Sequence, residues 1–223
     1  EQMVEDDIYG RDRLTRRVTR KDVGTHTTGA EWEVQFLWWN SESQSNWWDG
    51  FLRHALLVAD TVLIRARIAP YIGEKLQTAD PAGYIGIYGP DLQYRHASEN
   101  GELWAQATLF RALLAWYEYS GDAEVLNAVL NAMDVTMTAW PEGQSEPFRV
   151  NEPHAGIGHG LMLVDVLDSL ARLTGDSRYR DYAVFLFEDY CRHDLPEADI
   201  QFQNLRDPDY RFLGHGVHTF EHL

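Results

Sequence analysis

Hydrophobic residues along this chain alternate between stretches that are apolar on nearly every side and stretches that are apolar on one side only. Residues 47–59, 103–117 and 161–173 are almost continuously apolar, which predicts helices that are buried all round. Residues 61–77 and 123–137 instead carry apolar side chains on one stripe at helical spacing, with polar residues off it. After the third buried stretch, the same kind of stripe recurs at Tyr179, Tyr182, Ala183, Leu186 and Tyr190. The pattern predicts helical hairpins, each pairing a buried helix with a half-exposed one.

The short glycine-containing motifs between these stretches also repeat. Ser120-Gly121-Asp122 and Thr174-Gly175-Asp176 each predict a tight turn, in which the glycine ends one helix and the aspartate caps the next. Gly158-His159-Gly160 and Gly214-His215-Gly216 each open an apolar stretch and stand 56 residues apart. A repeat of this length, alternating buried and half-exposed helices, is typical of a ring of helical hairpins.

We therefore predict an all-α fold, an α/α toroid of the six-hairpin glycosidase type, with about three to four hairpins in this chain. Residues 1–44 are predicted to be an N-terminal arm and lead-in segment, and residues 45–223 a partial toroid catalytic domain. The basic stretch 11–21 is interpreted as part of a solvated arm rather than as an anion site. Pro70 is expected to kink or break the helix over 61–77.

Three long polar loops, residues 78–100, 141–157 and 192–213, each precede a predicted buried helix. The first is rich in Gly, Pro, Tyr and Ile, so we expect it to be packed and allow a short strand within it. Because the buried helices of a toroid run in one direction, these loops should gather at one end of the ring. The functional site is therefore expected at that end of the ring. The positive ends of the helix dipoles also lie there and can orient hydroxyl or carboxylate groups.

Composition narrows the range of partners. The formal net charge of −16 repels phosphate, which disfavours nucleic acid as a partner. No apolar run is long enough to span a membrane and no signal peptide is visible, so we expect no membrane partner and leave the cellular location and oligomeric state open. Cys191 is the only cysteine; it excludes an intramolecular disulfide within these residues, and its apolar neighbours predict a core filler.

Aromatic, acidic and histidine residues at the predicted loop end suggest a carbohydrate site. Apolar sugar faces stack on aromatic rings, polar side chains bind hydroxyls, and glycosidic cleavage uses a pair of carboxylates. Glu102 is the candidate catalytic residue, although it could simply complement its helix dipole. The predicted substrate-binding residues are Trp48, Asp49, Trp104, Glu152, His154, His159 and His215, with His218 as a further candidate. The tryptophans could instead belong to the core, and the histidines could be buried packing residues.

The histidines by themselves predict no metal site. His215, His218 and His222 have helical i+3 and i+4 separations, but the glutamate of a zinc-protease motif does not accompany them. We therefore expect no metal ligands and no cofactor within this chain.

Several stretches together resemble a known family. They are Asp80-Pro-Ala-Gly-Tyr-Ile-Gly-Ile-Tyr, Asn100-Gly-Glu-Leu-Trp, Ser120-Gly-Asp, His159-Gly-Leu-Met and Gly214-His-Gly-Val-His-Thr-Phe-Glu-His-Leu. Their order and spacing over residues 45–223 are similar to the N-terminal part of the catalytic toroid of the β-L-arabinofuranosidase-like glycoside hydrolases, family 127 and relatives.

The resemblance implies a retaining exo-glycosidase that acts on arabinofuranosyl or related glycans. In that family a zinc-held cysteine is the nucleophile and a glutamate the acid/base, both beyond the motif that matches Gly214-His215-Gly216. The resemblance therefore implies that the nucleophile lies outside this chain and that zinc is a cofactor of the complete protein only. The family's Glu-Leu-Tyr motif matches Glu102-Leu103-Trp104, but the histidine that often follows falls near Thr108, so one sugar contact is missing.

Two other functions fit the same pattern. A sugar epimerase on the same toroid would use the repeated His159 and His215 to move protons next to a carbonyl. A non-catalytic glycan-binding or scaffold module would need no turnover at all. All three interpretations have a carbohydrate partner or ligand in common, and fold analogy alone does not choose among them.

Overall fold

The computed structural model describes residues 7–10, 13–14, 39–95, 101–149 and 157–222. Within these ranges every regular element is a helix, and the strand allowed for the first long loop is replaced by one isolated parallel bridge between Leu14 and Tyr88. The all-α class is thus confirmed for the described part of the chain, whereas closure into a toroid stays a prediction.

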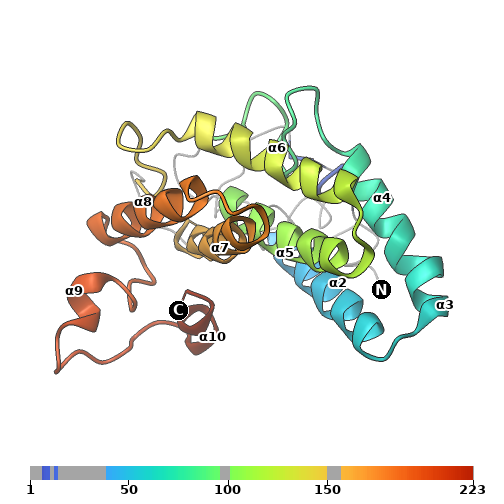
Figure 1. The fold of residues 1–223 in the computed structure, drawn as a ribbon. Coiled ribbons are helices and arrows are strands. Elements are labelled where there is room, and N and C mark those ends of the chain that lie inside the picture. Colours follow the sequence, from blue (N-terminus) through green and yellow to red (C-terminus); the bar gives the residue numbers. More distant parts are fainter. Residues whose placement is uncertain (1–6, 11–12, 15–38, 96–100, 150–156, 223) are drawn as a thin grey trace, which may run out of the picture.

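The helices form two layers (Figure 1). The elements, in chain order, are α2 (Trp39–Leu57), α3 (Thr61–Leu63), the π-helix η2 (Ile64–Ile68), α4 (Ala69–Gln77), α5 (Glu102–Ser120), α6 (Ala123–Ala139), the 3₁₀-helix η3 (Gly158–Met162), α7 (Leu163–Thr174), α8 (Arg178–Arg192), α9 (Phe202–Leu205) and α10 (Gly216–Glu221). Helices α2, α5 and α7 lie side by side in one layer, while α6 packs on α5 and α8 packs on α7. The predicted hairpins are therefore present, and α9 is a short helix inside the third long loop.

The two Gly-Asp turns close the hairpins as their sequence predicts. Gly121 follows α5 with φ of 70° and Gly175 follows α7 with φ of 74°, a left-handed conformation that glycine adopts without strain. Asp122 and Asp176 then accept hydrogen bonds from the backbone N–H groups two residues further on. These turns make α5/α6 and α7/α8 antiparallel pairs and leave the long loops at the opposite ends of the helices.

Only one of the three predicted buried helices is buried all round. Helix α5 is enclosed by α2, α6, α7 and η3, and nearly all of its residues from Glu102 to Ala115 are buried. Helix α7 is amphipathic, because it presents Asp165 and Asp168 to solvent. Helix α2 ends at Leu57, which is 83% exposed, and the next residue, Val58, is 63% exposed. The prediction of complete burial is wrong for these two helices, because part of α7 and the C-terminal end of α2 face solvent.

The first hairpin departs from its predicted boundaries. Helix α2 begins at Trp39, so Trp48 and Asp49 lie in its middle and not at its mouth. The second helix of this hairpin continues from residue 61 to residue 77 without a break. The expected effect of Pro70 takes the form of the π-helical turn η2, in which Ala69 N–H bonds to Ile64 O just before the proline.

The described N-terminal residues belong to the core. Ile8 and Tyr9 are buried, and the Tyr9 hydroxyl donates to Ala105 O of α5 at 2.8 Å. Arg13 donates through Nε to Gly86 O at 2.9 Å, which ties this segment to the first long loop. A solvated arm is therefore the wrong interpretation for residues 7–10 and 13–14, because an aromatic and an aliphatic side chain there fill space beside α5. The loop itself is packed, as expected, with Tyr84, Ile85 and Ile87 fully buried.

Gly160 is required by the close approach of η3 to α5. A Cβ atom at this position would lie 2.9 Å from Leu103 Cβ, which is fixed to the α5 backbone and cannot swing away. We expect Gly160→Ala to lower the free energy of unfolding by about 1–3 kcal/mol, the usual cost of overpacking. Urea unfolding is the measurement, with Gly158→Ala as the matched control, because its Cβ would meet no atom closer than 3.9 Å. Equal stability of the two variants would contradict this account of the helix contact.

Candidate functional site

The first turns of α5, η3 and α10 meet at the long-loop end of the hairpins. The Trp104 ring lies 4.3 Å from the His159 ring, and the His159 ring lies 4.0 Å from that of His218, measured between centroids. The His215 ring follows at 4.8 Å from His218. Trp104, His159 and His215, and the further candidate His218, are thereby brought into one group, which we call the histidine cluster.

The histidine cluster runs from the interior to the surface. Trp104 and His159 are each about 2% exposed, His218 is half-buried and His215 is exposed. Burial and the charges of His218, His222 and His215 lower the pKa of His159 to about 3, so its imidazole is neutral at neutral pH. The exposed end of the cluster is therefore the part that a soluble ligand can reach in this structure.

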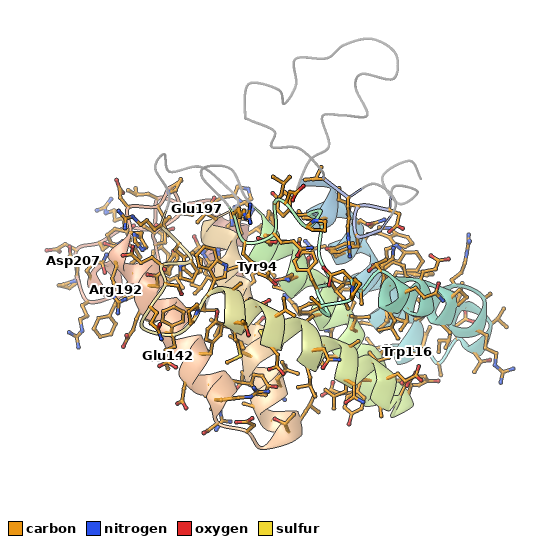
Figure 2. The ribbon with its side chains drawn as sticks, turned by 90° about the horizontal axis from the view of Figure 1, so that it is seen from above. Tyr94, Trp116, Glu142, Arg192, Glu197 and Asp207 are labelled. Carbon is orange, nitrogen blue, oxygen red and sulfur yellow. The ribbon has the colours of Figure 1, made fainter. Side chains whose placement is uncertain are left out.

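The loop between α8 and α9 supplies two acidic residues to the same place. Glu197 lies with Oε1 2.7 Å from His218 Nδ1 and Oε2 3.1 Å from His159 Nδ1. Figure 2 shows Glu197 toward one end of the hairpins and Trp116, in the last turns of α5, toward the other. Asp199 accepts hydrogen bonds from Gly214 N–H and Thr219 Oγ1, which holds the second Gly-His-Gly triplet and α10 in position. The sequence contains no signal for either residue, because both lie in an irregular loop.

Glu102 opens α5 but points into the protein. Tyr84 donates to Glu102 Oε1 at 2.9 Å, and Tyr94 N–H donates to Oε2 at 2.8 Å, so the carboxylate holds the first long loop against α5. Burial raises the pKa of Glu102 to about 8, although both hydrogen bonds act in the opposite direction. A raised pKa is a property that a general acid needs, whereas exposure of only 1% keeps the group from a large substrate in this structure.

The remaining candidates lie apart from the histidine cluster or outside the described residues. Trp48 stacks on Tyr71 of α4 with ring centroids 3.9 Å apart and thus joins α2 to α4. Asp49 pairs with Arg53 at 2.8 Å and lines a polar cavity of about 480 Å³ together with Arg111, Asp165 and other residues of α5 and α7. Glu152 and His154 fall in the range 150–156, which is outside the described residues.

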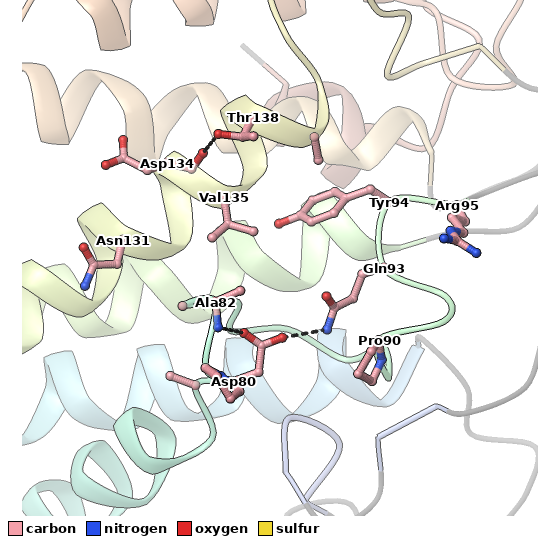
Figure 3. Close-up of a pocket in the computed structure, with 14 residues that line it drawn as sticks. Asp80, Ala82, Pro90, Gln93, Tyr94, Arg95, Asn131, Asp134, Val135 and Thr138 are labelled. Carbon is pink, nitrogen blue, oxygen red and sulfur yellow. Dashed lines mark hydrogen bonds between the residues drawn. The ribbon is translucent and has the colours of Figure 1, made fainter.

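A second cavity, of about 760 Å³, lies between the first long loop and α6 (Figure 3). Asp80 shapes its rim by accepting hydrogen bonds from Ala82 N–H at 2.9 Å and from Gln93 Nε2 at 3.2 Å. Tyr94 links this cavity to Glu102 through its backbone N–H. None of the predicted site residues that the structure describes lines it, and it is separate from the histidine cluster.

At Thr108, near which the family's histidine would fall, the side chain serves helix packing. Its hydroxyl is buried and donates to Ser45 Oγ of α2 at 2.9 Å. Cys191 is half-buried, and Phe202 N–H donates to its sulfur; burial raises its thiol pKa, which fits a packing residue and not a nucleophile. None of the helices in the described ranges is both long enough and apolar enough to cross a lipid bilayer.

Comparison with known protein families gives one match. Residues 43–207 match the profile of the family described as "Beta-L-arabinofuranosidase, GH127 catalytic domain". Searches among curated proteins and among solved structures returned no match.

Proposed function

Because the chain belongs to the family of β-L-arabinofuranosidase GH127 catalytic domains, we propose that it is part of a retaining exo-glycosidase that removes arabinofuranosyl or related sugars from glycans. In this proposal the described helices form part of an α/α toroid, and the carbohydrate enters at the long-loop end. Residues 1–223 supply substrate-binding side chains, and the nucleophile comes from outside them.

The observation that carries this proposal is the meeting of Trp104, His159 and His215 at the mouths of three helices. The exposed His215 binds a sugar hydroxyl directly, and His218 beside it supplies a second polar contact. Trp104 and His159 form the buried wall that fixes these two rings. Glu102 keeps the first long loop in place, and its raised pKa leaves it a candidate proton donor once substrate is bound.

The zinc centre implied by the family resemblance does not fit the residues present here. That centre is built on thiolates, and Cys191 is the only cysteine of this chain. Two groups of described side chains lie close enough together to share a metal ion, and Cys191 belongs to neither. We therefore derive no step of the reaction through such a centre.

One experiment distinguishes glycoside hydrolysis from sugar epimerisation. The full-length protein is incubated with an aryl β-L-arabinofuranoside, with other aryl glycosides and with free aldoses. We expect release of the aryl group from the arabinofuranoside and no change in the aldoses. Isomerised aldoses without cleavage would favour the epimerase, against which the pKa of about 3 at His159 already weighs. Sugar binding without any turnover would favour the glycan-binding module.

His215 provides the sharpest test of where the sugar binds. Its side chain is exposed, so His215→Ala should leave the free energy of unfolding nearly unchanged. Loss of its hydrogen bond to the sugar should weaken binding about 10-fold, as expected for about 1.4 kcal/mol. Calorimetric titration with an arabinofuranoside is the measurement, and His54→Ala, an exposed histidine on α2, is the control. Unchanged affinity in the His215 variant would move the sugar site away from α10.

A further inference from the structure

We propose that His159, Glu197 and His222 form a binding site for a divalent transition-metal ion, for which Zn²⁺ is the best match. Each residue offers one ligand atom, and the three atoms lie within 4.8 Å of one another. They come from η3, from the loop between α8 and α9 and from the residue that follows α10. This inference does not depend on the proposed glycosidase function, and it departs from the sequence-based expectation of no metal ligands in this chain.

The three ligand atoms share a second property. His159 Nδ1, Glu197 Oε2 and His222 Nε2 are buried, and none of them makes a hydrogen bond of suitable geometry to a described residue, although His159 Nδ1 and Glu197 Oε2 are close neighbours. A buried polar atom without a partner is energetically costly, so native proteins keep few of them. Three such atoms facing the same small space indicate that this space holds a ligand in the working protein.

The chemistry of the three atoms selects a cation. Two imidazole nitrogens and one carboxylate oxygen make the ligand set of many zinc sites, with positions left for water. Each ring ligates a metal through the lone pair of a neutral imidazole nitrogen.

The geometry needs only small side-chain movements. Ligand atoms of a tetrahedral zinc site stand about 3.3 Å apart, given bonds of about 2.0–2.2 Å. His159 Nδ1 and Glu197 Oε2 are already 3.1 Å apart. His218 Nδ1 lies 2.7 Å from the other carboxylate oxygen, Glu197 Oε1, so it orients the carboxylate and leaves Oε2 for the ion.

A second group of possible ligands, Glu146, Asp189 and His193, lacks this property. The Asp189 carboxylate accepts from Phe148 N–H at 2.9 Å and lies 3.1 Å from His193 Nε2, while Glu146 pairs with Arg149 at 2.7 Å. These side chains already have partners in the structure, so the group makes a suitable control.

The test is zinc binding by the purified 223-residue chain, measured by equilibrium dialysis and elemental analysis. We expect about one equivalent of zinc for the wild type and for His193→Ala. Glu197→Gln and His222→Ala should bind about 100-fold more weakly or worse, since loss of even an outer-shell partner costs about 10–100-fold. Zinc should also raise the melting temperature of the wild type but not of these two variants.

Folding of the variants is checked without metal. Tyr190 donates to the backbone carbonyl of Glu197, and Glu197→Gln keeps this contact. Cobalt in place of zinc should give the visible absorption of a tetrahedral site in the wild type and in His193→Ala, but not in Glu197→Gln or His222→Ala. The proposal is overturned if the wild type binds no zinc, if Glu197→Gln and His222→Ala bind it as tightly as the wild type, or if His193→Ala alone loses it. No substrate is used, so failure here leaves the glycosidase proposal to its own experiment.

Discussion

Replacement of Asp199 with alanine should lower the free energy of unfolding by on the order of 3 kcal/mol and release the loop that carries the second Gly-His-Gly triplet. The buried carboxylate accepts four hydrogen bonds of 2.8–2.9 Å, from Tyr210 Oη, Leu213 N–H, Gly214 N–H and Thr219 Oγ1. Burial alone would raise the pKa of Asp199, but these donors outweigh it and the pKa is lowered. Without the carboxylate, the donors lose their common partner and α10 loses its attachment.

Hydrogen exchange gives the specific readout for this variant. The amides of Leu213 and Gly214 should lose protection from hydrogen exchange in Asp199→Ala. The amides of α5 should lose only as much protection as the fall in the free energy of global unfolding accounts for. Asp207→Ala is the matched control, because Asp207 is exposed and its side chain accepts only from Asp209 N–H among the described residues. If both variants unfold at the same urea concentration, Asp199 does not organise this loop.

Replacement of Glu102 with glutamine should change how stability depends on pH. The pKa of Glu102 is about 8 in the folded protein and near 4.5 in the unfolded chain, so the folded state holds an extra proton between these values. Wild-type stability should therefore decline relative to Glu102→Gln as pH rises from about 4.5 to about 8, and the difference should be constant outside that window. The variant has no carboxyl group to titrate, so the comparison isolates this one group.

Urea unfolding of both proteins at pH 5, 6.5 and 8, values chosen to span about this window, provides the measurement. Tyr84→Phe is a useful companion, because it removes a hydrogen bond that lowers the pKa of Glu102 and should move the decline to higher pH. A difference that does not vary with pH would mean that Glu102 is ionised in the folded protein. Glu102→Gln also tests for a role in catalysis. If Glu102 is purely structural, this variant should lose activity only in proportion to the loss of folded protein.

Local sequence was enough to predict most helices. The stops at Gly121 and Gly175 and the caps at Asp122 and Asp176 act within one turn of chain, so their sequence reports them directly. The stripe of Val125, Val129 and Met133 is likewise a local pattern, and these residues are fully buried in α6. The family resemblance, which rests on the order of such motifs, was confirmed over residues 43–207.

The predictions that failed concern burial and helix starts. The apolar run at Leu57 and Val58 looks the same in sequence whether or not a neighbour covers it, and here these side chains are exposed. Helix α2 begins at Trp39 without a signal that separates it from the preceding apolar run. The charged residues of the N-terminal segment predict a solvated arm, yet contacts with distant residues bury Ile8 and Tyr9 within it.

For the candidate site, the sequence determined which residue types open the repeated helices. The repeat spacing and the residues of the turns can both be recognised from short stretches of the chain. Trp104, His159 and His215 follow from that period, and the structure brings them together. Only the tertiary structure decided that Glu197 and Asp199 lie beside them, that Trp48 packs on Tyr71, and that Glu102 faces inward. The physical reason is that burial, pKa and ligand convergence are properties of neighbours in space, and those neighbours come from segments far apart in the chain.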